Sequence, residues 1–328
     1  MLYHPVEIAS LKLDGNLFLA PVAGYSDRSF RSICVEHGAS FTYTEMVSAE
    51  ALVRKNIKTE TLMKRANNEK AYAVQIFGGD ESIMSQAANI VLEKTNCECI
   101  DINCGCPVPK IVKTGAGSSL TKNPTQLGKI VAAVKKATNG KAAVTVKIRS
   151  GWDEQSITFV EAAENAMAAG ADAITMHPRT RAQGYEGKSD WNKLAQLVKL
   201  AQGRIPIFGS GDLFNPEDAK AMLEQTGCDA VMFARGAMGN PFIFSKTIQL
   251  LKTGSYNDVP LEEKIKTGFK ELEMLAKDVG EFPACREMRK RFCAYSKGIH
   301  GGAELRTKII HASSIEDYRQ IFNQFSSF

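Results

Sequence analysis

Residues 71–103 read AYAVQIFGGDESIMSQAANIVLEKTNCECIDIN, and this stretch contains the repeating unit of the chain. It begins with a short apolar run, AYAVQIFG, and ends with another, ECIDIN. Between them, residues 78–95 have helical periodicity, with Asp80 before the first turn and Asn96 after the last. Strands that are apolar on both faces and alternate with helices indicate a parallel sheet.

The same alternation continues along most of the chain. Eight short apolar runs recur, at residues 17–21, 41–46, 71–78, 98–103, 142–149, 172–177, 205–212 and 229–236. Stretches with helical periodicity lie between most of them, at residues 78–95, 123–138, 155–170 and 215–227. Eight such units over roughly 230 residues predict an α/β fold, a (β/α)8 TIM barrel. A doubly wound sheet is the competing fold, but no G-x-G-x-x-G follows the first strand.

The pattern changes after the last of these strands. Helical segments follow at residues 260–280, 282–299 and 313–325, with no strand between them. Because no low-complexity tract or long linker occurs, we expect a C-terminal all-helical domain that packs directly on the barrel. The predicted domains are residues 1–244 for the barrel and residues 245–328 for the helices.

The composition favours a cytoplasmic protein with a large core. Of the 328 residues, 44% are hydrophobic, which is enough to fill a core without disulfide bonds. No apolar run approaches the roughly 18 residues of a membrane span, and the N-terminus lacks the layout of a secretion signal. The eight cysteines are therefore expected to be reduced thiols. The net charge of +5 is mild, so its distribution matters more than its total.

Four cysteines fall within the ten residues CECIDINCGC, at 97–106. Cys97 and Cys99 come at the start of a predicted strand, where small buried side chains are the simplest interpretation. Cys104 and Cys106 follow the carboxyl end of that strand and should face the active side of a barrel. The two pairs lie at opposite ends of a strand about 17 Å long, so they cannot form one zinc site, and we predict no metal.

The reacting groups of a TIM barrel lie at the carboxyl ends of its strands. At those positions the chain carries an amide, a thiol, a lysine, arginines and a histidine, in the runs ending at Gln75, Asn103, Arg149 and His177. The last two strands end in GSGD and ARGAMGN, where glycines and backbone N–H groups, with Arg235 beside a helix start, suit a phosphate. A phosphorylated ligand is expected there.

Seven motifs occur in order along the chain: LAPVAGYSDRSFR, AVQIFGGD, DINCGCPVPKIVKTGAGSSL, VTVKIRSGWD, MHPRTRAQGYEGKSDW, PIFGSGDL and FARGAMGNPFIF. The segment REMRKRFCAYSKGI follows them. This series resembles the tRNA-dihydrouridine synthases, most closely a bacterial B-type member, and it covers nearly the whole chain. The resemblance implies a TIM barrel that binds FMN and uses NADPH to reduce the C5=C6 bond of specific uridines in tRNA.

Cys106, between Gly105 and Pro107, matches the catalytic acid of that family. The chemistry agrees, because hydride addition at C6 of uracil places negative charge on C5 and O4, and C5 then needs a proton. A thiol of ordinary pKa, roughly 8.5, is protonated at neutral pH and can donate. Cys104 stands where the family more often has a large apolar residue, and we expect it to fill space. A disulfide or an exchange of roles between the two thiols is the alternative.

The resemblance also assigns residues to the flavin. A lysine at the position of Lys147 contacts the flavin in the family, where a cation stabilises negative charge on the reduced ring. The alternative for Lys147 is a structural ion pair. Val22 and Ser210 replace a more usual methionine and asparagine. The predicted cofactor-binding residues, of which the last six are expected to hold the phosphate, are Pro21, Val22, Ala23, Gln75, Lys147, His177, Ser210, Gly211, Asp212, Ala234, Arg235 and Gly236.

A uridine in folded tRNA must be unstacked and turned into the pocket, so contacts elsewhere have to supply binding energy. Residues 285–311 carry seven Lys and Arg against two Glu, a local excess of five positive charges, with Phe292 and Tyr295 interleaved. This pattern predicts a phosphate-binding helix face, and a solvated helix face is the alternative. The predicted tRNA-binding residues are Asn103, Arg149, Arg179, Arg181, Arg286, Arg289, Lys290, Arg291 and Lys297.

Two other functions stay open on the sequence. One is a flavin-dependent barrel such as a dihydroorotate-type dehydrogenase, which acts on a free pyrimidine and needs no basic helical tail. The other is a tRNA-binding protein without catalytic activity. We expect a monomer with no obligate protein partner.

Overall fold

The computed structural model describes residues 2–297, 299 and 301–325, and its central feature is a closed parallel barrel. Eight strands pair in the order β3, β4, β6, β7, β8, β9, β10 and β11, and β11 pairs with β3 to close the ring. This confirms the predicted (β/α)8 TIM barrel. The strands are β3 (Leu17–Leu19), β4 (Phe41–Tyr43), β6 (Tyr72–Phe77), β7 (Cys99–Cys104), β8 (Ala143–Gly151), β9 (Ala173–Thr180), β10 (Ile207–Ser210) and β11 (Ala230–Phe233).

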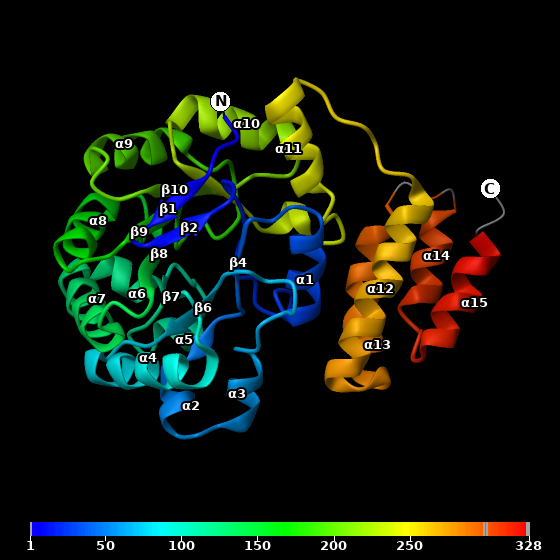
Figure 1. Cartoon of the computed structure of the whole chain (residues 1–328), viewed down its shortest axis with the longest axis horizontal. Coiled ribbons are helices and arrows are strands. Elements are labelled where there is room, and N and C mark those ends of the chain that lie inside the picture. The colour runs from blue at the N-terminus through cyan, green and yellow to red at the C-terminus, as the bar shows by residue number, and fades with distance from the viewer. Residues whose placement is uncertain (1, 298, 300, 326–328) are drawn as a thin grey trace.

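Helices surround the barrel, as Figure 1 shows. Side chains at the helix ends explain where several of them begin and stop. In α4 (Glu81–Thr95), Asp80 accepts the N–H of Ile83, and Asn96 ends the helix in the left-handed region at a φ of 49°. The others around the barrel are α1 (Arg28–Glu36), α2 (Ala49–Val53), α3 (Ile57–Thr61), α5 (Pro109–Val112), α6 (Ser118–Lys122), α7 (Pro124–Thr138), α8 (Phe159–Ala168), α9 (Trp191–Ala201), α10 (Pro216–Thr226) and α11 (Ile243–Thr253).

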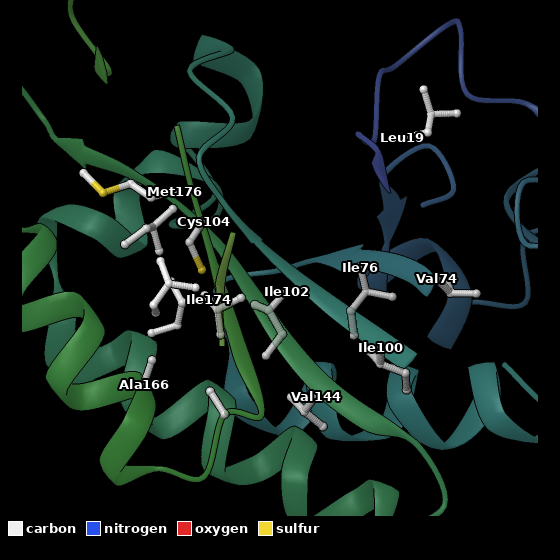
Figure 2. Close-up of a cluster of buried hydrophobic side chains, with 14 of the residues drawn as sticks. Leu19, Val74, Ile76, Ile100, Ile102, Cys104, Val144, Ala166, Ile174 and Met176 are labelled. Carbon is white, nitrogen blue, oxygen red and sulfur yellow. The ribbon is translucent and has the colours of Figure 1, made fainter. Parts of the chain in front are cut away.

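Alternate residues of β7 face opposite sides of the barrel wall. Ile100, Ile102 and Cys104 belong to the large cluster that also includes buried residues of the surrounding helices, and Figure 2 shows this cluster. Cys99 belongs instead to the cluster inside the barrel. The two-residue period of a strand therefore decides which β7 side chains pack under helices and which point to the barrel axis.

A short hairpin that the sequence analysis did not predict closes the amino end of the barrel. It consists of β1 (Val6–Ile8) and β2 (Leu11–Leu13), which pair antiparallel. Val6, Ile8 and Leu13 are buried in the same cluster as interior side chains of the barrel strands, among them Phe18 and Phe208. The barrel interior is thus packed at this end. The two-residue strand β5 (Val47–Ser48), also not predicted, pairs with β6 beside the ring.

The C-terminal residues form four helices, α12 (Leu261–Val279), α13 (Glu281–Tyr295), α14 (Gly302–Ile309) and α15 (Ile315–Phe325). Figure 1 shows them as a bundle beside the barrel, joined to α11 by an extended segment. They enclose their own cluster of buried side chains, including Leu272, Phe292 and Phe322. Three of these helices were predicted; α14 was not, and residue 298, included in the predicted segment 282–299, lies outside the described residues.

The bundle meets the barrel mainly along α1. Arg28 pairs with Asp278, and Lys270 pairs with Glu36 at 2.6 Å. The predicted boundary at residue 244 falls within α11, which packs on α10 of the barrel. Within the described residues, no helix combines the length and the apolar composition that a membrane span requires.

Candidate active site

A cavity of about 320 Å³ opens at the carboxyl end of the barrel strands, within the size range of ligand pockets. Strand register brings the functional side chains together there. Lys147 on β8 is level with Asn103 on β7, and Arg149 is level with His177 on β9. The predicted residues that line the cavity are Pro21, Val22, Ala23, Gln75, Asn103, Cys106, Lys147, Arg149, His177, Ser210, Gly211, Asp212, Ala234 and Arg235.

The loop that carries Cys106 is held by a side-chain cap. The Oδ1 atom of Asn103 accepts hydrogen bonds from the N–H groups of Gly105, at 3.2 Å, and Cys106, at 3.0 Å. The carbonyl of Cys106 in turn accepts the N–H of Ser118 at 3.0 Å. Cys106 is half-buried, and burial raises the pKa of its thiol above the ordinary value. The thiol is therefore protonated at neutral pH and can act as an acid.

A chain of buried hydrogen bonds fixes the orientation of the amides beneath this loop. Asn103 Nδ2 donates to Gln75 Oε1 at 2.8 Å, and Gln75 Nε2 donates to Asp101 at 2.6 Å. The hydroxyl of Thr145 donates to the other oxygen of Asp101 at 2.6 Å. Burial raises the pKa of Asp101 to about 6, against the opposing hydrogen bonds. Since Asp101 only accepts when ionised, it sets which end of each amide points toward the cavity.

Lys147 places an ammonium group in the cavity with no hydrogen-bond or ion-pair partner among the described residues. Burial, together with the charge of Arg149, lowers the pKa of Lys147 to about 8; Asp101 opposes this shift. A buried cation without a counter-charge lowers the stability of the folded protein. Because Lys147 makes no ion pair with a described residue, the structure does not support the alternative of a structural ion pair. The side chain is suited to an anionic ligand.

His177 is neutral at physiological pH. Burial and the nearby charges of Lys147, Arg149 and Arg179 lower its pKa well below the ordinary value. Its Nε2 atom lies 3.3 Å from Nη1 of Arg179, which can only donate, so the ring proton is assigned to Nδ1. His177 therefore acts as a hydrogen-bonding group of fixed orientation and adds no charge to the cavity.

The turns after β10 and β11 form the polar end of the cavity. In the described part of the chain, the N–H groups of Gly211 and Asp212 donate to no other residue. Asp212 adopts the left-handed region, with a φ of 59°, and receives hydrogen bonds from Arg179 at 2.7 Å and from Ser189. Burial opposes its ionisation, but these bonds outweigh the burial and keep the Asp212 pKa below its ordinary value. Free backbone donors beside a positive φ suit a phosphate.

Gly236 does not line the cavity, but it allows the two turns to pack together. A Cβ atom at this position would lie 2.1 Å from the carbonyl oxygen of Leu213. Any larger residue would push apart the turns after β10 and β11. Gly236 thus contributes to the phosphate end through close approach of the backbone.

Arg149, predicted to contact the substrate, is largely committed to the protein. It is 3% exposed, and its guanidinium donates to the carbonyls of Gly105 at 2.9 Å, Thr180 at 2.8 Å and Gly184 at 2.9 Å. These bonds link the Cys106 loop to the loop after β9. Arg149 lines the cavity while holding the two loops in place.

Arg179 and Arg181 lie outside the cavity. Arg179 is 1% exposed and donates to the Glu186 and Gly187 carbonyls as well as to Asp212. Its guanidinium is therefore committed to acceptors within the protein. Arg181 lies 4.6 Å from the ring of Trp152, and Lys122 lies 4.8 Å from the same ring. Arg181 follows the end of β9 and is half-buried against this ring.

The basic residues of α13, and Lys297 shortly after it, have different environments. Arg286 and Lys297 are exposed, whereas Arg289 is half-buried and donates to the Ala312 carbonyl. Lys290 is exposed and donates to the carbonyl of Gly24 at 2.7 Å, in the loop whose neighbours Val22 and Ala23 line the cavity. Lys290 of α13 therefore lies beside the mouth of the barrel.

Arg291 is 1% exposed and joins the bundle to the barrel. It pairs with Glu271 of α12, at 2.5 Å, and with Asp27 at the start of α1. In this position it cannot reach a tRNA phosphate, so we assign it to the joint. Phe292 and Tyr295, read from the sequence as part of the basic face, are buried in the bundle.

Several residues of the site were missed by the sequence analysis. Met46, Tyr185 and Phe214 line the cavity, and Asp101 anchors the buried amides. Tyr185 is 60% exposed and lies in the loop after β9, so an aromatic residue within RTRAQGYEGK was the available signal. Asp101 alternates with Asn103 along the strand, which was a signal that the two share a face.

The cysteines make no disulfide and share no metal cluster. All eight are free thiols, and Cys104 is fully buried on the outer side of β7. The part of the chain that the structure describes contains no group of three His, Cys, Asp or Glu side chains suited to a metal ion.

Comparison with known proteins gives consistent matches over the whole length. A family model described as dihydrouridine synthase matches residues 18–326. A probable tRNA-dihydrouridine synthase of Treponema pallidum (strain Nichols) is 54% identical over 325 residues, which cover 98% of this chain and 96% of that protein. A tRNA-dihydrouridine synthase B of Pseudomonas putida is 34% identical over 313 residues, covering 95% of this chain and 90% of that protein.

Two solved structures are similar in fold. Histamine dehydrogenase from Rhizobium sp. 4-9 aligns with a TM-score of 0.57 at 14% identity, over 83% of this chain and 51% of that chain. The 6-hydroxypseudooxynicotine amine oxidase of Pseudomonas geniculata N1 aligns with a TM-score of 0.60 at 13% identity, over 81% of this chain and 52% of that chain. The chain spans about half the length of each, and the likeness supports the barrel fold alone.

Proposed function

Because this chain belongs to the dihydrouridine synthase family, as a B-type tRNA-dihydrouridine synthase, we propose that its barrel cavity holds FMN and that NADPH is the reductant. The substrates are specific uridines of tRNA, whose C5=C6 bond is reduced. We further propose that the enzyme acts as a cytoplasmic monomer without an obligate protein partner.

The cavity fits FMN in three respects. The unpaired ammonium of Lys147 suits a ring system that becomes anionic on reduction. The amide of Gln75 lies in the same cavity and can hydrogen-bond a flavin edge, while the N–H groups of Gly211 and Asp212 suit its phosphate. When bound and reduced, FMN would supply the hydride that adds to C6 of the uracil ring.

Cys106 is the proposed acid that protonates C5. Its thiol lines the cavity, and burial keeps it protonated by raising its pKa. Asn103 holds the backbone of the Cys106 loop through two hydrogen bonds, so the backbone that carries the thiol is held in place before the substrate binds. The observation that carries this proposal is the convergence of Cys106, Lys147 and Asn103 on one cavity.

The tRNA is proposed to bind across the barrel mouth and the bundle. Residues 245–328 are the proposed tRNA-binding domain, with Arg286, Lys290 and Lys297 as its accessible cations. Arg181 on the barrel rim supplies a further positive charge. Contacts of these side chains with phosphates would offset the cost of unstacking the uridine.

The direct test is conversion of tRNA that lacks the modification. Purified protein reconstituted with FMN is incubated with NADPH and this tRNA, and the dihydrouridine content is measured by mass spectrometry. We expect dihydrouridine at defined positions and matching consumption of NADPH. Free orotate and uracil serve as control acceptors. Absence of dihydrouridine with an FMN-loaded protein, or equal reduction of the free pyrimidines, contradicts the proposal.

A further inference from the structure

A second hollow, of about 930 Å³, lies next to the active-site cavity on the barrel rim. It is bounded by the loop between β9 and α9 and by the turns after β10 and β11. Tyr185, Asp212, Phe214 and Arg235 line both spaces. The two spaces therefore lie on either side of a shared wall, and a ligand that reacts in the cavity can extend over this wall into the hollow.

The wall shared by the two spaces presents aromatic surface. Arg235 lies 4.4 Å from the ring centroid of Tyr185 and 5.1 Å from that of Phe214, so it is held between the two side chains. Tyr185 is 60% exposed and Phe214 is 44% exposed. Exposed rings beside a guanidinium offer stacking surface to a planar base.

The charges around the hollow are largely paired within the protein. Asp212 pairs with Arg179 and Arg235, and Asp190 pairs with Lys193 at 2.7 Å. The carboxylate of Asp218, which also lines the hollow, accepts the N–H groups of Phe214 and Asn215.

Lys188 is the exception. It is exposed, lines the hollow and has no partner in the described part of the chain. One free ammonium matches a single phosphate group. A track along an RNA backbone requires several unpaired cations, so the hollow favours a small phosphorylated ligand over tRNA.

We propose that this hollow binds the adenosine end of NADPH, with its 2′-phosphate at Lys188 and its adenine against Tyr185 and Phe214. The nicotinamide then reaches the active-site cavity over the wall at Arg235. The inference rests on the proposed use of NADPH. It follows from size as well as charge, since a cavity of about 320 Å³ that holds a flavin has no room for a whole dinucleotide.

The first test measures binding without any hydride transfer. The FMN-loaded enzyme is titrated with 2′,5′-ADP, which carries the adenosine and the 2′-phosphate but no nicotinamide, by isothermal titration calorimetry. Lys188→Gln should raise the Kd at least about tenfold, because a charge-assisted pair is lost. Lys199→Gln, an exposed lysine of α9 outside the hollow, is the matched control and should leave the Kd unchanged. An unchanged Kd in Lys188→Gln overturns the proposal.

The second test separates this site from the chemistry. Reduction of bound FMN is followed by stopped-flow absorbance with NADPH and with N-benzyl-1,4-dihydronicotinamide, which has neither adenosine nor phosphate. Lys188→Gln should weaken saturation by NADPH while leaving the rate with the benzyl compound unchanged. A loss of tRNA affinity in Lys188→Gln with normal binding of 2′,5′-ADP would assign the hollow to RNA instead. Failure to convert tRNA by an enzyme that still binds 2′,5′-ADP through Lys188 refutes the proposed function alone.

Discussion

Cys104 and Cys106 are two residues apart, yet they lie on opposite sides of the barrel wall. Cys104 is the last residue of β7 and packs in the outer cluster, where it is fully buried. Cys106 follows in a loop that turns back over the barrel and lines the cavity. Burial places the pKa of the Cys104 thiol well above its ordinary value, so this sulfur is chemically inert.

Replacement of the two thiols should therefore have different effects. Cys106→Ala should lower the rate of dihydrouridine formation by about 10²-fold or more, because a general acid is removed. Cys104→Ala should leave that rate nearly unchanged and lower the free energy of unfolding by about 1 kcal/mol through a small cavity. Mass spectrometry of tRNA and urea denaturation measure the two effects. Affinity for tRNA should be the same in both variants, and equal product from both contradicts the assignment of Cys106.

In the flavin-free protein, the buried ammonium of Lys147 should lower the free energy of unfolding. Its pKa of about 8 in the folded state lies below the ordinary 10.5, so between these values the unfolded state binds the proton more tightly. The free energy of unfolding of the wild type should therefore rise as the pH increases from about 8 toward 10. Below pH 8 the full penalty of the buried charge applies.

Lys147→Met should accordingly raise the free energy of unfolding at pH 7 by about 1–3 kcal/mol. Its advantage over the wild type should shrink at pH 9, and its affinity for FMN should fall. Urea denaturation at the two pH values measures the first effect and fluorescence titration measures the second. Lys199→Met, at an exposed position, is the control. Equal stability of Lys147→Met and wild type at both pH values would show that burial of the Lys147 ammonium does not lower the free energy of unfolding.

At the scale of elements, β7 and the loop that follows it act as one unit. Asn103 connects them, because it belongs to the strand and accepts two backbone N–H groups of the loop. Its own amide is oriented through Gln75 by Asp101. The position of the Cys106 thiol therefore depends on a carboxylate buried inside the barrel.

Asn103→Ala should slow proton transfer from Cys106 by about 10²-fold, because the two loop N–H groups lose their shared acceptor and the thiol is displaced. Asn103→Asp keeps the acceptor for both N–H groups but loses the donor to Gln75, so it should retain more activity. Single-turnover formation of dihydrouridine by pre-reduced enzyme measures this step. Reduction of the enzyme by NADPH should change much less in either variant. An equal loss in the two variants would contradict the capping role.

The elements that sequence predicts well are those with a strong local pattern. All eight barrel strands were predicted within a few residues, since each is an apolar run next to a turn. The hairpin of β1 and β2 was missed because each strand, VEI and LKL, has a charged residue at its centre and so forms no apolar run. Helix α14 was missed because it begins at Gly302, which gives no side-chain cap.

In the site, too, the residues that could be predicted are those whose position follows from the local strand pattern. Residues at strand ends, such as Lys147 and His177, could be placed in one cavity because barrel topology brings strand ends together. Arg291 could not be placed, because its partners Asp27 and Glu271 are 264 and 20 residues away in the chain. A basic helix pattern contains no information about which cations are neutralised by distant carboxylates.

At the scale of the whole molecule, the joint between bundle and barrel is made largely of ion pairs. Arg28 pairs with Asp278, Lys270 with Glu36, and Arg291 with Asp27. Arg291→Met would leave Glu271 buried without its cation, at a cost of about 3–5 kcal/mol. We expect the bundle to loosen from the barrel in this variant.

Faster proteolysis at residues 254–260 and weaker tRNA binding should report this loosening, while the barrel keeps its affinity for FMN. The double variant Arg291→Met with Glu271→Gln removes the uncompensated charge and should recover part of the protease resistance. Protease resistance and tRNA affinity equal to wild type in Arg291→Met would show that the joint does not depend on this residue.

The hairpin that packs against the amino end of the barrel has a consequence for kinetics. With Val6, Ile8 and Leu13 packed against that end, the described residues leave the cavity open at the carboxyl end of the strands. Nicotinamide and the flipped base would therefore reach the FMN proposed to bind there from the same side, one after the other. The enzyme should alternate between an oxidised and a reduced form and release NADP⁺ before tRNA reacts. Double-reciprocal plots of the rate against tRNA concentration, measured at several NADPH concentrations, should then be parallel.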